Sequence, residues 1–477
     1  MQTRCPRCPS DAIFERGFER IRRDLGVVVE FPEPVARHAR ALAERGPRVP
    51  AGGDAPRDAR ELPFVTIDPA GSRDLDQAYA AERLGSGYRV FYAIADVAGF
   101  VTHDDVVSET ARERGVTLYF PDVRAALHPE VLSEGAASLL PGEDRQAILW
   151  SIDLDEAGHT GAVSVERALV RSREALSYVE AQARIDGGSA DSSLALLRPI
   201  GERRQELERD RGAVSLKLPS QEVVHSDGGY DLVYDTSLPI EGWNAQISLM
   251  CGMVAAGLML DGGVGILRTL PPTHQGEVER LRRVAKALEL DWPADVAYQD
   301  QLRSITGATA VEAAFLQQAV TVFRGAGYET LEGEVDTPPI HGAIAAPYAH
   351  VTAPLRRIGD RYANEVVLSL AAGHEPPAWL HEELADLPSL LGDAKRRSGT
   401  AERATIDFVE AVVLSSHVGQ VLPAEVVDVD HDDFRVQLRD PAVIARVDGS
   451  AELGAHVEVR VAGVEPDARR VELELLS

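Results

Sequence analysis

The order of the hydrophobic patterns along the chain is the feature that most limits its fold. Apolar residues recur at strand spacing first, over residues 88–97, 147–155 and 164–173. Helical spacing dominates after that, over residues 194–211, 248–260, 276–290, 311–325 and 361–371. Strands followed by helices, rather than alternating with them, predict an α+β fold.

The two ends of the chain read differently from this central part. Residues 13–25 and 34–45 show helical spacing, and a Pro- and Gly-rich linker follows them. Residues 373–415 again read as helix. Five short apolar runs at 422–429, 434–438, 443–447, 456–461 and 471–475 predict a small OB-type β-barrel. We therefore expect four parts: a helical module (1–57), a catalytic domain (58–372), a helical connection (373–415) and an OB-fold domain (416–477).

Composition indicates a soluble globular protein of several domains, with 477 residues of which 44% are apolar and 26% charged. No apolar run approaches the roughly 20 residues of a membrane span, and no apolar leader opens the chain. Three cysteines cannot form a disulfide framework, and the pair Cys5 and Cys8 lacks the partners of a zinc site. These features predict a cytoplasmic protein.

The net charge of −27 argues against nucleic acid as a partner, because phosphate binding depends on Lys and Arg. Local potential inside a cleft matters more than the total, however. Nearly all cations are arginines, whose planar guanidinium matches phosphate. Two groups stand out, one at Arg356, Arg357 and Arg361 and another at Lys395, Arg396, Arg397 and Arg403.

Three carboxylates lie within nine residues in the segment TIDPAGSRDLDQA, residues 66–78. A strand-like run delivers Asp68, a Gly/Ser turn follows, and Asp74 and Asp76 sit two residues apart. Like charges aimed at one point repel unless a cation lies among them. Oxygen ligands of this kind suit Mg²⁺, or Mn²⁺, and such ions suit phosphodiester hydrolysis. A solvated acidic turn is the alternative interpretation of this segment taken alone.

The same segment resembles the signature of the ribonuclease II / ribonuclease R family, whose RNB domain is a 3′-to-5′ exoribonuclease. Further blocks resemble the family in its order: FYAIADV (91–97), ARERGVTLYFP (111–121), LHPEVLS with SLLPGEDR (127–133 and 138–145), and YAHVTAPLRR (348–357). The resemblance implies an RNB-type catalytic domain and a C-terminal RNA-binding OB domain. The family usually places two OB domains at the amino terminus, and about 57 residues cannot hold them.

The resemblance implies that Asp68, Asp74 and Asp76 are catalytic residues that hold Mg²⁺ for attack of water on the last phosphodiester. The family's fourth aspartate falls at Gln77, which offers a carbonyl oxygen as a ligand but no charge. Two outcomes follow from this departure. Either the site works with weaker metal affinity, which we favour, or the protein binds RNA without hydrolysing it.

The remaining site residues also follow from the resemblance. Arg356 matches the catalytic arginine that contacts the scissile phosphate, and Arg357 is its neighbour in the RNA site. Tyr119 matches an aromatic residue that packs on the 3′-terminal nucleotide. Glu402 aligns with a carboxylate of the last helical block, near RNA.

We therefore expect a Mg²⁺-dependent hydrolytic exoribonuclease that degrades single-stranded RNA from its 3′ end, processively, to nucleoside 5′-monophosphates. A monomer with no obligate protein partner is expected from the family precedent. There are two rival hypotheses. One is a non-enzymatic RNA-binding protein that lost catalysis because Gln77 stands in place of the fourth aspartate, and the other is a nuclease for DNA or short oligonucleotides.

Overall fold

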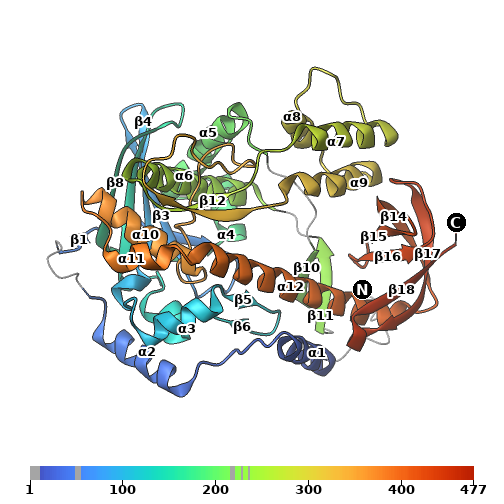
Figure 1. The fold of residues 1–477 in the computed structure, drawn as a ribbon, viewed down its shortest axis with the longest axis horizontal. Helices are drawn as coiled ribbons and strands as arrows, with labels where there is room; N and C mark the ends of the chain where they lie inside the picture. The colour runs from blue at the N-terminus through green and yellow to red at the C-terminus, as the bar shows by residue number, and fades with distance from the viewer. Residues whose placement is uncertain (1–10, 49–54, 215–220, 227–228, 235–236, 477) are drawn as a thin grey trace.

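The computed structural model describes residues 11–48, 55–214, 221–226, 229–234 and 237–476. Cys5 and Cys8, the incomplete zinc motif, lie outside these residues. Figure 1 shows a catalytic part built around a large sheet, a long helix, α12, that leaves it, and a β-barrel at the far end of that helix. The predicted α+β fold with a C-terminal barrel is confirmed.

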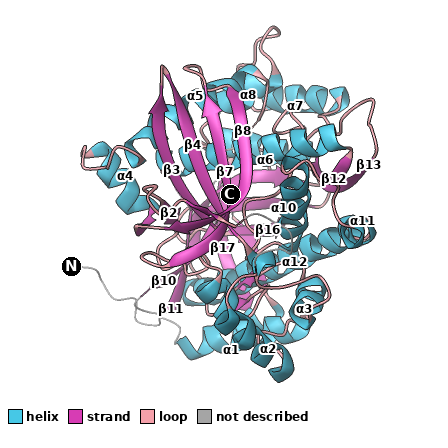
Figure 2. Cartoon of the chain, turned by 90° about the vertical axis from the view of Figure 1, so that its left-hand side faces the viewer, coloured by secondary structure: helices cyan, strands magenta, loops and turns pink. Residues whose placement is uncertain are grey.

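The central sheet has seven strands in the order β1-β8-β7-β4-β3-β2-β9, fanned out in Figure 2. Their bounds are β1 Arg57–Asp58, β2 Val65–Asp68, β3 Gln77–Leu84, β4 Gly87–Ala95, β7 Asp144–Leu154, β8 Thr160–Arg171 and β9 Glu174–Ser177. The antiparallel pairs β3–β4, β4–β7 and β7–β8 form its middle. The three runs predicted at strand spacing are β4, β7 and β8.

Both faces of this sheet are covered, as the alternation along β4 shows. Val90, Tyr92 and Ile94 belong to one hydrophobic core, whereas Phe91 and Ala93 belong to another on the opposite face. A sheet buried on both sides holds its strand ends rigidly. The segment that carries the aspartates lies between two of its strands, β2 and β3.

Helices α4 (Tyr178–Asp186), α5 (Leu197–Asp210), α6 (Pro239–Gly262) and α10 (Ile358–Ala371) contribute to the first core. Among the described residues α6 is the one helix long and apolar enough to cross a membrane, which the sequence did not lead us to expect. Its Ile247, Met250 and Met259 are fully buried, and it packs against α5 and α10. It is therefore the core helix of this domain.

The two helices of the N-terminal module pack on different parts of the molecule. Helix α2 (Glu33–Arg45) adds Val35 and Ala39 to the second core of the sheet. Helix α1 (Asp11–Asp24) instead places Phe14 and Phe18 against Phe408 of α12. The module thus joins the catalytic part to the far end of the chain.

Several small elements were not predicted. Hairpins β10 (Gln221–Ser226) with β11 (Gly229–Tyr234), β12 (Val264–Thr269) with β13 (Gly327–Glu332), and β5 (Leu118–Tyr119) with β6 (Arg124–Ala125) lie apart from the main sheet. A π-helix spans Val131–Ala136. Strands therefore also occur among the helices α3 (Val106–Arg114), α7 (Gln275–Ala287), α8 (Tyr298–Ser304) and α9 (Ala310–Ala319).

Helices α11 (Ala378–Leu384) and α12 (Leu387–Leu414) form the helical connection, and the barrel follows. Its five strands are β14 (Val421–Val429), β15 (Asp433–Leu438), β16 (Ile444–Asp448), β17 (His456–Glu465) and β18 (Arg470–Leu475), closed in the order β14-β15-β16-β18-β17. Its aromatic residue Phe434 is fully buried. The barrel therefore has no aromatic side chain with which to stack on a base.

Candidate active site

Asp68 is the last residue of β2, and its side chain shares a face of that strand with Thr66. Both residues line a cavity of about 360 Å³ that the turn at 69–72 and the end of β9 complete. The Oδ2 atom of Asp68 and the Oγ1 atom of Thr66 are buried without a hydrogen-bond partner. Burial raises the pKa of Asp68 to about 6, and Arg356 opposes this shift. This carboxylate oxygen therefore has no protein donor that a ligand would have to replace.

Asp76 is fully buried and contacts the segment YAHVTAPLRR (348–357), called the arginine block below. Its Arg356 lies 280 residues further along the chain. The Oδ1 atom of Asp76 accepts a hydrogen bond of 2.7 Å from the Leu355 amide, and its Oδ2 accepts one of 3.1 Å from Arg356 Nε. Burial raises the pKa of Asp76 to about 7, while Arg356 lowers it. The pairing holds Arg356, the arginine predicted to be catalytic, next to Asp76.

Gln77 begins β3 and also contacts the arginine block. Its Nε2 donates a short hydrogen bond to the carbonyl of Thr352, a buried residue. Asp76 and Gln77 are consecutive, so together they tie residues 352–356 to the edge of the sheet. The amide nitrogen at this position therefore has a structural partner, and the role of Gln77 as a metal ligand stays a prediction.

Asp74 lies on the loop before β3 and faces the hairpin β5–β6. Tyr119 Oη donates to Asp74 Oδ2 at 2.7 Å, and Arg124 Nη1 donates to Oδ1 at 3.0 Å. Arg124 also reaches Glu134 on the π-helix, with Nη2 2.9 Å from Oε1. Sequence reasoning missed Arg124 and Glu134. The sequence marks neither, although Arg124 lies five residues after Tyr119 and directly opposite it in the hairpin.

The three aspartates do not converge on one point as the sequence led us to expect. Among the described residues, no group of three or more His, Cys, Asp or Glu side chains is arranged to hold a metal ion. The physical reason is that Arg124 draws Asp74 to one side and Arg356 draws Asp76 to another. Asp74 and Asp76 are thus each paired with a different guanidinium, whereas Asp68 keeps an oxygen without a partner.

The donors that remain still suit Mg²⁺, which usually takes one or two carboxylates together with water and substrate phosphate. Asp68 offers its unpartnered oxygen, and Asp74 is close enough to raise the pKa of Asp68 electrostatically. Asp68 and Asp74 would therefore hold the ion, with Asp76 serving Arg356. This is a smaller ligand set than the predicted Asp68, Asp74, Asp76 and Gln77.

The predicted RNA-binding arginines divide into exposed and structural ones. The side chain of Arg356 is 43% exposed and that of Tyr119 also reaches solvent, with 51% of the residue exposed. Arg357 is less exposed, because it pairs with Asp360 at 2.7 Å. Arg361 is buried and bonds Ser108 and the carbonyl of Val101. The first basic group is thus not a single phosphate-binding surface.

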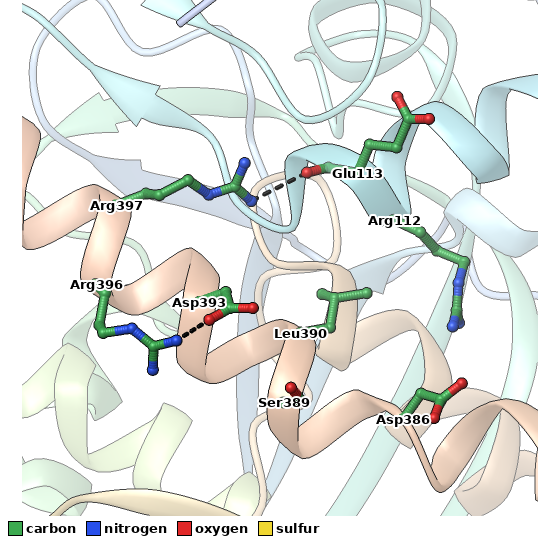
Figure 3. Close-up of a pocket in the computed structure, with 8 residues that line it drawn as sticks. All are labelled: Arg112, Glu113, Asp386, Ser389, Leu390, Asp393, Arg396 and Arg397. Atoms are coloured by element: carbon green, nitrogen blue, oxygen red, sulfur yellow. Dashed lines mark hydrogen bonds and ion pairs between the residues drawn. The ribbon is translucent and has the colours of Figure 1, made fainter. Parts of the chain in front are cut away.

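The second basic group lies on α12 beside α3, around a surface pocket of about 640 Å³ (Figure 3). Arg396 pairs with Asp393, and Arg397 donates to the carbonyls of Glu113 and Arg114. Acidic and basic side chains alternate around this pocket, so it does not form a plain phosphate-binding surface. Glu402 lies on an exposed face of the same helix, and its predicted contact with RNA stays a prediction.

The fold and the site define an RNB-type nuclease domain, and the comparison with protein families agrees. The RNB domain model matches residues 56–372, and the C-terminal S1 domain of RNase II-type exonucleases matches residues 420–476. The chain belongs to the RNB family. Its ribonucleases are 3′-to-5′ exoribonucleases, hydrolases of the phosphodiester bond, and this chain is an enzyme of that class.

Curated relatives are similar over nearly the whole chain. Ribonuclease R of Aquifex aeolicus is 27% identical over 96% of this chain and 70% of its own length. Ribonuclease R of Escherichia coli is 24% identical over 94% of this chain and 60% of its own length. The chain therefore spans 60–70% of the length of these two relatives.

Solved structures share the fold at lower identity. RNase R of Mycoplasma genitalium in complex with ribose-methylated single-stranded RNA has a TM-score of 0.86 at 18% identity, covering 97% of this chain and 78% of that one. Yeast Ssd1, described as a pseudonuclease, has a TM-score of 0.73 at 15% identity, covering 97% of this chain and 58% of that one. These two likenesses are likenesses of fold.

Proposed function

We propose that this chain is a Mg²⁺-dependent exoribonuclease that degrades single-stranded RNA from the 3′ end to nucleoside 5′-monophosphates. The observation that carries the proposal is the pairing of the buried Asp76 with the partly exposed Arg356, together with the Asp68 oxygen that has no hydrogen-bond partner. Together they place a guanidinium and a carboxylate where a phosphate and a cation would meet. We further propose that the enzyme acts processively, as a monomer, in the cytoplasm.

The side chains have separable roles in this reaction. Among the described residues, Arg356 uses its Nε for Asp76, which leaves its two Nη groups for the phosphoryl oxygens of the scissile bond. Tyr119 keeps its ring exposed while its hydroxyl is held by Asp74, so the ring can stack on a 3′-terminal base of any sequence. Mg²⁺, held by Asp68 and Asp74, would activate the attacking water and offset charge on the phosphate.

The test is a time course on 5′-labelled single-stranded RNA with Mg²⁺, with EDTA and with the variant Asp76→Asn. Asp76→Asn removes the charge that orients Arg356 but keeps an oxygen for the Leu355 amide. We expect a ladder that shortens from the 3′ end in the wild type and full-length RNA in both controls.

A matched control is Asp153→Asn, which breaks a carboxylate–arginine pair with Arg89 at 2.6 Å on the same sheet, outside the site. This variant should degrade RNA at the wild-type rate. Turnover by Asp76→Asn at the wild-type rate would contradict the proposed role of the pair. Uncleaved RNA that is nonetheless retarded on a native gel would favour the rival function, an RNA-binding protein without catalysis. Matched RNA and DNA oligonucleotides in competition would identify the substrate class.

A further inference from the structure

Arg124 is a side chain of the site for which the proposed reaction supplies no role. It stands directly opposite Tyr119 in the hairpin β5–β6, and the two residues together occupy both oxygens of Asp74. Arg124 takes Oδ1 at 3.0 Å and Tyr119 takes Oδ2 at 2.7 Å. The side chain of Asp74 is only 13% exposed, so water competes poorly with these bonds.

A cation at Asp74 therefore shares the carboxylate with both donors, because each oxygen accepts one hydrogen bond and keeps a second lone pair. The bond from Arg124 is the one that opposes a cation directly, because it carries a positive charge at the same carboxylate. Asp68, by contrast, has an oxygen with no partner to displace. The two proposed ligands thus differ: Asp68 has an oxygen without a hydrogen bond, whereas both oxygens of Asp74 accept one.

We propose that Arg124 is a latch on Asp74, meaning a positioning residue whose positive charge competes with a divalent cation for that carboxylate. The inference rests on the Mg²⁺ site of the proposed function. In this view the guanidinium takes the place of the cation in the free enzyme and sets the affinity for the metal. Gln77, which lacks the charge of the family's fourth aspartate, leaves one carboxylate fewer to counter this arginine.

Glu134 makes such an exchange feasible. Arg124 Nη2 lies 2.9 Å from Glu134 Oε1, and the Glu134 side chain is buried to a similar degree as Asp74. When a cation takes Asp74, Arg124 keeps this second carboxylate and so does not become an unpaired, half-buried charge. The ion pair with Glu134 thus holds the guanidinium of Arg124 near the site with or without a cation at Asp74.

The experiment measures Mn²⁺ binding by the free Mn²⁺ signal in electron paramagnetic resonance, without RNA, on the full chain. Arg124→Gln removes the competing charge and should lower the Mn²⁺ dissociation constant at least about fivefold, as loss of a partly buried charge-assisted bond predicts. Arg124→Lys keeps the charge but lacks the planar fork whose Nη1 and Nη2 reach the two carboxylates, and it should bind Mn²⁺ more tightly than the wild type by a smaller factor. This second variant carries the test if the first does not fold.

The matched control is Arg73→Gln. Arg73 precedes Asp74 in the chain and lies 3.7 Å from the same Glu134, but its side chain is 66% exposed, and no bond to Asp74 is found among the described residues. We expect its Mn²⁺ affinity to equal that of the wild type. Equal tightening in Arg73→Gln and Arg124→Gln, or no tightening in Arg124→Gln, would overturn the latch. A wild type that binds no Mn²⁺ would instead overturn the proposed metal site, and the latch with it.

Discussion

Replacing Gln77 separates two roles that the sequence could not distinguish. If Gln77 is a weak metal ligand, Gln77→Asp restores the family's fourth carboxylate and should strengthen metal binding. If its main role is the hydrogen bond to Thr352, Gln77→Asp removes a donor and places a carboxylate near a carbonyl oxygen. The geometry favours the second role, because the amide nitrogen is the atom bound to the arginine block.

The size of the effect follows from the burial of the acceptor. Thr352 is 5% exposed, so its carbonyl loses a partner that water cannot readily replace. An unsatisfied buried acceptor costs roughly 1–3 kcal/mol. If this free energy is lost from the stabilisation of the transition state, because Arg356 is no longer held in position, kcat falls by roughly fivefold to 150-fold. Affinity for RNA outside the site should change little.

The assay compares Gln77→Asp, Gln77→Glu and Gln77→Asn by the rate of mononucleotide release at saturating RNA and a series of Mg²⁺ concentrations. Gln77→Glu has the size of glutamine without its donor, so it isolates the hydrogen bond from the change in volume. We expect both acidic variants to be slow at every Mg²⁺ concentration, and Gln77→Asn, which keeps a shorter amide, to be intermediate. Faster turnover by Gln77→Asp at low Mg²⁺ would refute the reasoning and restore the ligand role.

Two further predictions concern stability. Burial raises the pKa of Glu410 to about 7, so its ionised form is disfavoured in the folded state. Protonated Glu410 therefore contributes fully to the free energy of unfolding below about pH 4.5. That contribution, on the order of 3 kcal/mol, is lost as pH rises through 7. Glu410→Gln, which keeps an oxygen for the Ile444 amide, should raise the Tm relative to wild type at pH 8 but not at pH 4.5; an equal difference at both would contradict this. Gly17→Ala places a methyl group 1.9 Å from the Phe408 ring and should lower stability by about 1–3 kcal/mol in urea unfolding, whereas Gly257→Ala, a helical site with open space, should not lower it. Equal effects of the two alanines would show that α1 does not depend on this contact.

Much of the fold was predictable because long elements carry long periodic signals. The strands β4, β7 and β8 and the five barrel strands were all expected close to their observed bounds, whereas the helical stretch predicted over 373–415 is divided into α11 and α12. The hairpins β10–β11 and β12–β13 were missed because six-residue strands among helices give too short an alternation to recognise. Helix α6 shows a related difficulty, since an apolar core helix and a membrane span look alike in composition.

The site was predictable only where its residues are neighbours in the chain or match a family block. The aspartate segment was visible in the sequence, and Arg356 was assigned from the resemblance although it lies 280 residues from Asp76. Arg124 and Glu134 belong to no recognisable motif in the sequence. They reach Asp74 only because a hairpin of two-residue strands and a π-helix place them there. Arg361 shows the opposite error, since a basic residue near the motif turned out to be buried.

The charge of the site connects these observations. Asp68, Asp74, Asp76 and Glu134 face three guanidinium groups, those of Arg73, Arg124 and Arg356, so carboxylates outnumber arginines in this site. An RNA phosphate entering it adds more negative charge, and repulsion grows unless a cation arrives with it. Cation and RNA should therefore bind with positive coupling, each raising the affinity for the other by the same factor. In a chain as acidic as this one, RNA should therefore bind in the reactive position only when the metal is present. The arginines then position the phosphate, and the cation reduces its repulsion by the carboxylates.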